Sequence, residues 1–263
     1  MSRLTGLHAI LAALEAGGRS FDRIVLLRGR RDARVEAILT LARTRRVQVR
    51  WVDRATLDRL AEGERHQGGV ALVSEVAYAE ESEVLADAGP RPFLLVLDGI
   101  EDPRNLGAVV RTAAAAGVQG VFLPERSAVG ASAAAARAAA GAMDRVRLVR
   151  TGNVAALLTR LQERGIWVVG IDAGGEPIWG GFDLTLPVAL VVGSEGSGLR
   201  RLVRDRCEVL LGIPMPGGGE SLNLSVAAAV AMFEVVRRRG ESGPVGRPAG
   251  PSGKMLAKTQ PLC

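Results

Sequence analysis

Apolar residues between Phe93 and Arg239 gather in short, continuous runs instead of alternating with polar residues. Such runs are typical of parallel strands that are covered on both faces of a sheet, and the segments between them have helical spacing. We therefore expect a parallel-sheet α/β domain. Its strands should lie near residues 93–98, 121–123, 146–149, 166–171, 188–192 and 208–213.

The first 76 residues show the same alternation of strand and helix on a smaller scale. The pattern predicts helices over 6–16, 32–43 and 54–61, and strands over 24–27, 47–52 and 70–73. We expect four segments: a small α/β domain over residues 1–76, an acidic linker over 77–92, a large domain over 93–239, and a disordered Gly-, Pro- and Ser-rich tail over 240–263.

The last helical pattern, from Leu222 to Arg239, is apolar on most sides and rich in alanine. It ends in Arg237-Arg238-Arg239, and three cations suit the negative end of a helix dipole. A helix this apolar is expected to be buried within the domain or against a second subunit.

Composition narrows the class of protein. At 263 residues and 48% hydrophobic content, the chain is long enough to build two cores. No apolar run approaches the roughly 18 residues of a membrane span, and no signal-peptide pattern is present, so we expect a soluble, cytoplasmic protein. Two Cys and two His exclude a disulfide framework and argue against a metal site.

The formal net charge of +6 and the sequence pI near 10.4 indicate a polyanionic partner. Nearly all of the basic residues are arginine, a skew that a GC-rich genome would also produce. Residues 19–65 alone hold 13 Arg and seven acids, an excess equal to that of the whole chain. An RNA phosphate could be bound at the strand-to-helix junction formed by Arg28, Arg30, Arg31 and Arg34. A solvated basic face is the alternative.

Polar residues follow three of the apolar runs. After 93–98, Asn105 is expected to cap the next helix, and Arg111 falls in the half of that helix where the dipole is positive. Because helical side chains lean toward the N-terminus, Arg111 can reach the helix start over Gly107 and Ala108 and hold an anion there. The alternative is a solvated Arg111 and an Asn105 that only caps.

The second turn is Gly193-Ser194-Glu195-Gly196-Ser197-Gly198, directly after the run 188–192. It lacks the spacing of a dinucleotide fingerprint and the ending of a phosphate loop. Its glycines would let a ligand approach the backbone closely, and Glu195 adds a carboxylate. Turn geometry alone would also explain the glycines.

The third turn runs from Ile213-Pro214-Met215-Pro216 through a glycine run to Ser221-Leu222-Asn223-Leu224-Ser225. Ser221 and Asn223 can cap the last helix, which is a sufficient structural role for each residue alone. The three turns are informative as a set.

In this order the three segments resemble the three motifs of the SPOUT class of RNA methyltransferases, in the TrmH-like branch that methylates ribose 2′-hydroxyls. The resemblance covers residues 93–239. The N-terminal part extends it, because Gly6-Leu7-His8-Ala9 and His66-Gln67-Gly68-Gly69-Val70-Ala71 are similar to the ends of the ribosomal-protein-L30e-like domain of the RlmB type.

The resemblance implies S-adenosylmethionine as methyl donor, a C-terminal trefoil knot around its pocket, and a homodimer whose active site uses both subunits. It implies catalytic roles for Asn105, Arg111, Glu195, Ser221 and Asn223. It implies a cofactor pocket formed by Gly193, Glu195, Gly196, Ile213, Met215, Leu222 and Leu224. Because a guanidinium stays protonated at neutral pH, we expect Arg111 mainly to hold an RNA phosphate and to stabilise developing alkoxide charge.

The implied reaction is methyl transfer to a ribose 2′-hydroxyl of RNA, with a guanosine of 23S ribosomal RNA as the first choice of substrate. Neither cysteine lies in the three turns, which argues against covalent cysteine chemistry. A tRNA or another ribosomal RNA site is an alternative within the class. From a different class, the chain could be a catalytically idle RNA-binding or ribosome-assembly factor. A generic nucleotide-binding enzyme is disfavoured by the missing phosphate and dinucleotide loops.

Overall fold

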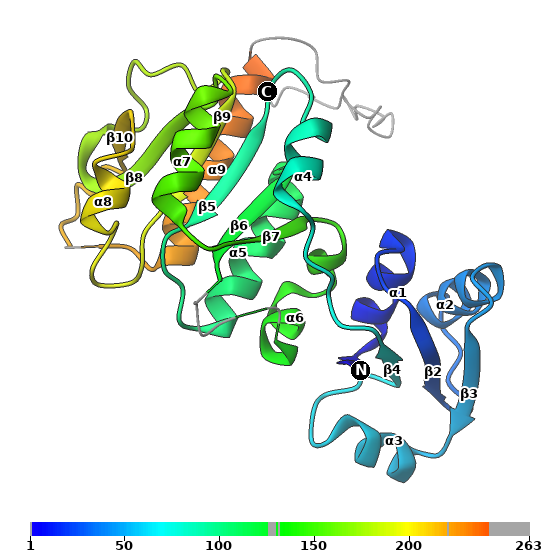
Figure 1. The fold of residues 1–263 in the computed structure, drawn as a ribbon. Coiled ribbons are helices and arrows are strands. Elements are labelled where there is room, and N and C mark those ends of the chain that lie inside the picture. Colours follow the sequence, from blue (N-terminus) through cyan, green and yellow to red (C-terminus); the bar gives the residue numbers. More distant parts are fainter. Residues whose placement is uncertain (1, 126–129, 131, 220, 242–263) are drawn as a thin grey trace, which may run out of the picture.

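The computed structural model describes residues 2–125, 130, 132–219 and 221–241. The chain folds into two α/β parts, each built around its own sheet (Figure 1). Among the helices in these residues, none has the length and apolar character needed to cross a membrane.

The N-terminal part is a four-stranded sheet in the order β1-β4-β2-β3 with three helices. Its elements are β1 (Ser2–Thr5), α1 (Leu7–Ala16), β2 (Phe21–Leu27), α2 (Ala33–Thr44), β3 (Gln48–Val52), α3 (Arg54–Ala61) and β4 (Gly69–Val73). Asp32 and Asp53 accept backbone N–H groups of α2 and α3, which fixes where these helices begin. The three helices and three strands expected here are confirmed within a few residues.

The C-terminal part is a six-stranded sheet in the order β10-β8-β9-β5-β6-β7, in which every neighbouring pair is parallel. Its strands are β5 (Phe93–Leu97), β6 (Gly120–Pro124), β7 (Arg147–Thr151), β8 (Trp167–Pro177), β9 (Val188–Val192) and β10 (Val209–Gly212). Its helices are α5 (Pro103–Ala116), α6 (Ala133–Ala139), the 3-10 helix η1 (Ala142–Asp144), α7 (Val154–Glu163), α8 (Arg201–Arg204) and α9 (Leu224–Glu241).

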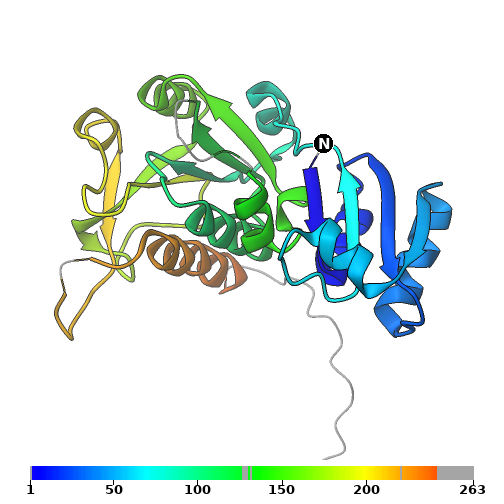
Figure 2. The same cartoon turned by 90° about the horizontal axis from the view of Figure 1, so that it is seen from below.

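The centre of this sheet is covered on both faces, as the unbroken apolar runs predict. Every residue of β5 and β9 is buried. On one face the core includes side chains of α5 and α9, which lie side by side in Figure 2, and on the other it includes side chains of α7 and α8. β5 and β9 are also neighbours in the sheet, so the loops that follow them emerge together.

Two expectations need correction. The expected linker over 77–92 contains helix α4 (Glu81–Asp87), in which Glu81 and Glu83 suit the positive helix start and Val84 is buried against the sheet. The sequence pattern also missed β1, since only one of its four residues is buried. The first two residues of the expected tail, 240 and 241, belong to the last turn of α9. The rest of the tail, 242–263, lies outside the described residues.

The two parts contact each other directly. Gly141, just before η1, packs against α1: a Cβ added to it would lie 2.4 Å from Cβ of Ala12. Arg137 of α6 forms an ion pair of 2.5 Å with Glu64 of the N-terminal part. A second ion pair, between Arg19 and Asp144, is buried.

Candidate active site

The three polar turns meet at the carboxyl ends of β5 and β9. The first turn joins β5 to α5, the second follows β9, and the third leads into α9, which packs against α5 on the same face of the sheet. Ligands of parallel α/β sheets bind at this edge of the strands, because the loops there converge.

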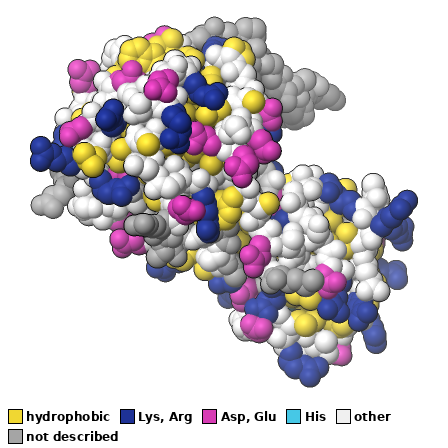
Figure 3. All heavy atoms as spheres, viewed as in Figure 1, with side chains coloured by type: hydrophobic (Ala, Val, Ile, Leu, Met, Phe, Trp, Pro, Cys, Tyr) yellow, Lys and Arg dark blue, Asp and Glu magenta, His cyan; other side chains and the backbone are white. Residues whose placement is uncertain are grey.

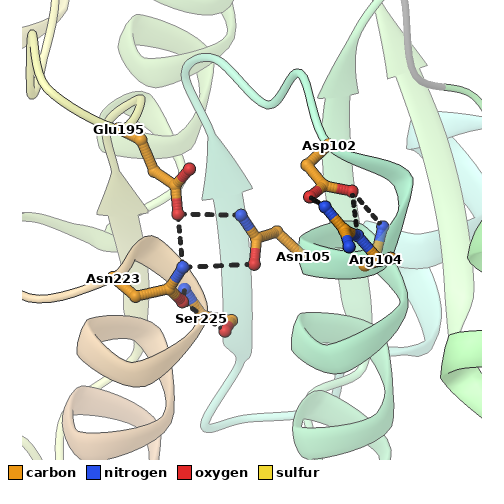
Figure 4. A network of polar contacts seen from close by, with 6 residues as sticks. All are labelled: Asp102, Arg104, Asn105, Glu195, Asn223 and Ser225. Carbon is orange, nitrogen blue, oxygen red and sulfur yellow. Dashed lines mark hydrogen bonds and ion pairs between the residues drawn. The ribbon is translucent and has the colours of Figure 1, made fainter.

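Three side chains, one from each turn, form a single hydrogen-bond network (Figure 4). Asn105 Nδ2 donates to Glu195 Oε1 at 2.8 Å, and Asn223 Nδ2 donates to the same oxygen. Asn223 Nδ2 also lies 3.3 Å from Asn105 Oδ1. Asn223 Oδ1 accepts from the backbone N–H of Ser225 at 2.9 Å, so Asn223 caps α9 as the sequence predicts.

The glycine loop after β9 is held by a short antiparallel bridge between Ser194 and Gly198. Gly193 permits the loop to fold back on itself, because a Cβ there would lie 2.1 Å from the backbone carbon of Gly198. The far end of the loop is tied to β5: the fully buried carboxylate of Asp98 accepts from the backbone N–H of Arg200 at 2.8 Å and pairs with its guanidinium. This contact raises the pKa of Arg200 above its ordinary value.

A cavity of about 280 Å³ opens beside the network. It is lined by all seven residues that the family resemblance assigns to the cofactor: Gly193, Glu195, Gly196, Ile213, Met215, Leu222 and Leu224. Ser221 lines it as well. The volume is near the lower end of the range for small-molecule sites, roughly 300 Å³.

Sequence reasoning missed part of this cavity and its support. Ile171, Asp172 and Ala173 of β8 also line the cavity, because β8 runs to Pro177, past its expected end at 171. The polar residue Asp172, directly after the apolar run 166–171, could have indicated that this strand also contributes to the site. Asp98 ends β5 in the same way, but its partner Arg200 is distant in the sequence.

The first turn differs from expectation in two details. Asp102, rather than Asn105, caps α5 by accepting from the backbone N–H of Arg104 at 2.7 Å. Asn105 therefore lies inside the first helical turn, where its side chain is free to reach Glu195. Gly107 does not lie open beneath Arg111: a Cβ there would be 2.3 Å from Cβ of Ala138, so Gly107 is where α6 packs on α5.

Arg111 is exposed on α5 and is not part of the network. Helix residues seven apart point in nearly the same direction, so Arg111 lies on the same face of α5 as Arg104. Arg111 and Asn105 are six residues apart, so their side chains point in directions that differ by about 120°. Across the part of the chain that the structure describes, no hydrogen bond or ion pair joins Arg111 to Glu195. Of the five expected catalytic residues, a single copy of the chain thus joins Asn105, Glu195 and Asn223 in one network and places Ser221 at the adjoining cavity, while Arg111 stands apart.

The arginines at the strand-to-helix junction of the N-terminal part fall into two groups. Arg30 is engaged: its guanidinium pairs with Asp32 at 2.7 Å and lowers the pKa of that carboxyl. Arg28, Arg31 and Arg34 are exposed, and their side chains have no hydrogen bond or ion pair with the described residues. Figure 3 shows basic side chains along the outer border of this part.

Comparison with known proteins agrees with this geometry. Residues 92–233 match the SpoU rRNA Methylase family, and residues 3–79 match a domain described as RNA 2′-O ribose methyltransferase substrate binding. The putative TrmH family tRNA/rRNA methyltransferase YacO of Bacillus subtilis is 38% identical over 92% of this chain and 96% of its own length. The 23S rRNA (guanosine-2′-O-)-methyltransferase RlmB of Ralstonia nicotianae is 42% identical, over 90% and 95%.

A solved structure gives the same result for the fold. The SpoU methyltransferase AviRb from Streptomyces viridochromogenes, in complex with AdoMet, has a TM-score of 0.76 and 25% identity over 92% of this chain and 91% of that one. Fold, cavity and relatives together define an RNA ribose 2′-O-methyltransferase that uses S-adenosylmethionine. The chain belongs to the SpoU rRNA methylase family. The expected fold class, family and cofactor are confirmed, and the trefoil knot stays a prediction.

The residues of the cavity fit that cofactor. Ile171, Ile213 and Leu222 offer apolar surface for a purine ring, while the backbone of the glycine loop can bind its polar edge. Asp172 and Glu195 can accept hydrogen bonds from ribose hydroxyls and from the amino acid end. Among the described residues, no cluster of three or more His, Cys, Asp or Glu could hold a metal ion.

Proposed function

We propose that this chain methylates the ribose 2′-hydroxyl of a guanosine in 23S ribosomal RNA, in the cytoplasm. Proteins with that named activity match both of its parts: those of Ralstonia nicotianae and Yersinia pestis are 42% and 41% identical and are covered over 95% and 96% of their lengths. These relatives share the N-terminal part as well as the catalytic part. That supports a common RNA substrate, because enzymes of one fold can act on different substrates and the residues outside the reaction centre help to select among them.

The network around Glu195 orients the acceptor. S-Adenosylmethionine supplies, when bound, a methyl group on a sulfonium. Because Glu195 Oε1 accepts from Asn105 and Asn223 at once, both amides are held in one orientation. The second carboxylate oxygen has no hydrogen bond with the described residues and can accept one from the 2′-hydroxyl. Ser221, at the cavity rim, is the fourth group of this acceptor site.

Arg111 supplies the positive charge, from a second copy of the chain. Its exposed side chain can hold an RNA phosphate and stabilise the developing alkoxide, while the proton leaves late or through water. A homodimer is supported by α9, which begins at the active site and exposes an apolar stripe along its length: Val226, Phe233 and Val236 are 47%, 48% and 36% exposed. The dimer would cover this stripe and bring one Arg111 to the other subunit's network.

The N-terminal part provides RNA affinity. Arg28, Arg31 and Arg34 are free to bind phosphates, and each phosphate contact adds to the salt dependence of binding. Removing residues 1–76 should therefore reduce both the affinity for RNA and the slope of affinity against salt, while the cavity of the remaining part still binds S-adenosylmethionine.

The decisive experiment maps 2′-O-methyl groups in RNA from cells with and without this gene. Loss of one guanosine methyl in 23S ribosomal RNA is the expected result. Loss of a methyl from tRNA, or from another ribosomal RNA position, would overturn the substrate assignment. An unchanged map together with no measurable binding of S-adenosylmethionine would favour an idle assembly factor.

A further inference from the structure

Gln67 has a left-handed backbone conformation although it is neither a glycine nor the end of a helix. Four described residues other than glycine have positive φ: Arg46, Glu62, Gln67 and Ala140. Glu62 and Ala140 are the left-handed caps of α3 and α6, and Arg46 directly follows the cap of α2. Left-handed residues are common at helix ends because they satisfy the last carbonyls. Gln67 ends no helix.

The residue lies in a tight turn before β4. The backbone N–H of Gly69 donates to His66 O at 2.9 Å, and the two central residues, Gln67 and Gly68, have φ of 47° and 90°. Two positive φ values are those of a type I′ turn, whose first central position favours Asn, Asp or Gly. Glycine would satisfy the backbone at least as well, so the fold alone does not call for this side chain.

Neighbouring groups hold the turn. His66 is 9% exposed, and its Nδ1 accepts from the backbone N–H of Gly68 at 3.0 Å while Nε2 lies 2.8 Å from Asp58. Arg30 donates to Gln67 O at 2.6 Å. These contacts fix the main chain of Gln67 and leave its side chain exposed, with no hydrogen bond to the described residues.

The turn lies at the same edge of the sheet as the free arginines. Gly68 O accepts from the backbone N–H of Leu27 at 3.0 Å, and the next residue, Arg28, donates to Val52 O at 2.8 Å. The turn, Arg28 and the end of the edge strand β3 are therefore adjacent. Arg31 and Arg34 follow at the start of α2, and both are exposed.

We propose that Gln67 reads an unpaired base of the RNA that these arginines hold. A primary amide presents a donor and an acceptor side by side, which is the group that pairs with the edge of a base, whereas guanidinium groups beside it bind phosphates. Sequence-specific recognition of RNA uses unpaired bases whose edges are accessible. Gln67 thus adds selectivity for one base to a basic surface that otherwise binds RNA phosphates without regard to sequence. The inference rests on RNA as substrate.

The test separates the side chain from the turn. Gln67→Gly removes the amide but keeps, or improves, the fit to a left-handed φ, so its midpoint of thermal unfolding should be equal to or above that of the original protein. Its affinity for a transcribed 23S ribosomal RNA should fall about tenfold. The slope of affinity against salt should stay unchanged, because no charge is lost. Arg34→Ala should instead lower the slope by about one.

Ala140→Gly is the matched control, since Ala140 also has a φ of 49° and the change removes neither a charge nor an amide. It should relieve the same backbone strain without weakening RNA binding. Unchanged RNA affinity of Gln67→Gly, or a fall in its unfolding midpoint, would overturn the inference. Binding is measured independently of methyl transfer. A chain that binds RNA through Gln67 yet transfers no methyl would contradict only the proposed function, and one that binds no RNA would contradict both.

Discussion

Arg19 and Asp144, which are 125 residues apart in the chain, form an ion pair that joins the two parts of the protein. Arg19 Nε lies 2.5 Å from Asp144 Oδ1, and the two side chains are only 1% and 2% exposed. Burial raises the pKa of Asp144, while the charge of Arg19 opposes that shift. Arg19 Nη1 and Asp144 Oδ2 have no hydrogen-bond partner among the described atoms.

Breaking this pair should therefore be costly. Arg19→Ala leaves a buried carboxylate without its counter-charge, and we expect a loss of about 3–5 kcal/mol in the free energy of unfolding. Arg137→Ala removes the more exposed ion pair with Glu64 and should cost less than about 1 kcal/mol. Denaturant unfolding measures both. A loss for Arg19→Ala no larger than the control would show that the pair does not hold the two parts together.

The fold was largely predictable because it depends on local patterns, whereas its long-range pairs were not. Continuous apolar runs at 93–97 and 188–192 identify buried parallel strands on their own. Nothing near Arg19 in the sequence indicates Asp144, and nothing near Asp98 indicates Arg200. The segment containing α4 was wrongly predicted to be a linker, because its many acidic residues indicate a solvated loop and only one of its residues, Val84, is buried.

The candidate site was predictable in its members and less so in its geometry. Gly193, Ile213 and Leu222 line one cavity because each follows a strand or precedes a helix at the same edge. The rest depends on where the helix begins: Asn105 reaches Glu195 because α5 begins at Pro103, three residues earlier than it would if Asn105 were the cap. The same helix start turns Arg111 outward.

Glu195 should be essential for catalysis rather than for folding. Glu195→Ala frees the amides of Asn105 and Asn223, and a displacement of about 1 Å in such groups can lower the rate about 10²-fold. Glu101→Gln, which changes an exposed carboxylate of the neighbouring turn, serves as control and should stay close to the original rate. Single-turnover methylation of 23S ribosomal RNA measures both. Equal rates for the two variants would show that Glu195 is not part of the active site.

Arg111 and Arg104 offer a matched pair on one helix face. Arg111→Ala should lower the rate of methyl transfer by on the order of 10²- to 10³-fold, as expected when a group that stabilises transition-state charge is removed. Arg104 is paired with Asp102, so Arg104→Ala should have a small effect. Mixing Arg111→Ala with a catalytically inactive Glu195→Ala variant tests the homodimer, because mixed dimers would regain one complete site. Failure to regain activity would argue against a site shared between subunits.

Gly193 should be required for the shape of the cofactor cavity. In Gly193→Ala the new Cβ would meet the backbone of Gly198, so the loop must move, with a cost of about 1–3 kcal/mol or more. Gly217→Ala is the control, since no atom lies within 4 Å of a Cβ at that position. Calorimetric titration with S-adenosylmethionine should show weaker binding for the first variant only. Equal affinities would place the cofactor away from this loop.

Cys207 should be chemically inert in the folded protein. Burial is the main cause that raises the pKa of its thiol, from 9.0 to about 12, with smaller contributions from Asp98 and Asp172. The thiolate is the reactive form, so at pH 8 the folded protein holds almost none of it, and unfolding restores the ordinary pKa and the reactivity.

In a Cys263→Ser variant, which leaves Cys207 as the single cysteine, a thiol reagent should react at pH 8 only after denaturant is added. Because the shift is upward, native reactivity should grow as the pH rises toward 12. Rapid labelling of the native protein at pH 8 would contradict the raised pKa of this half-buried thiol.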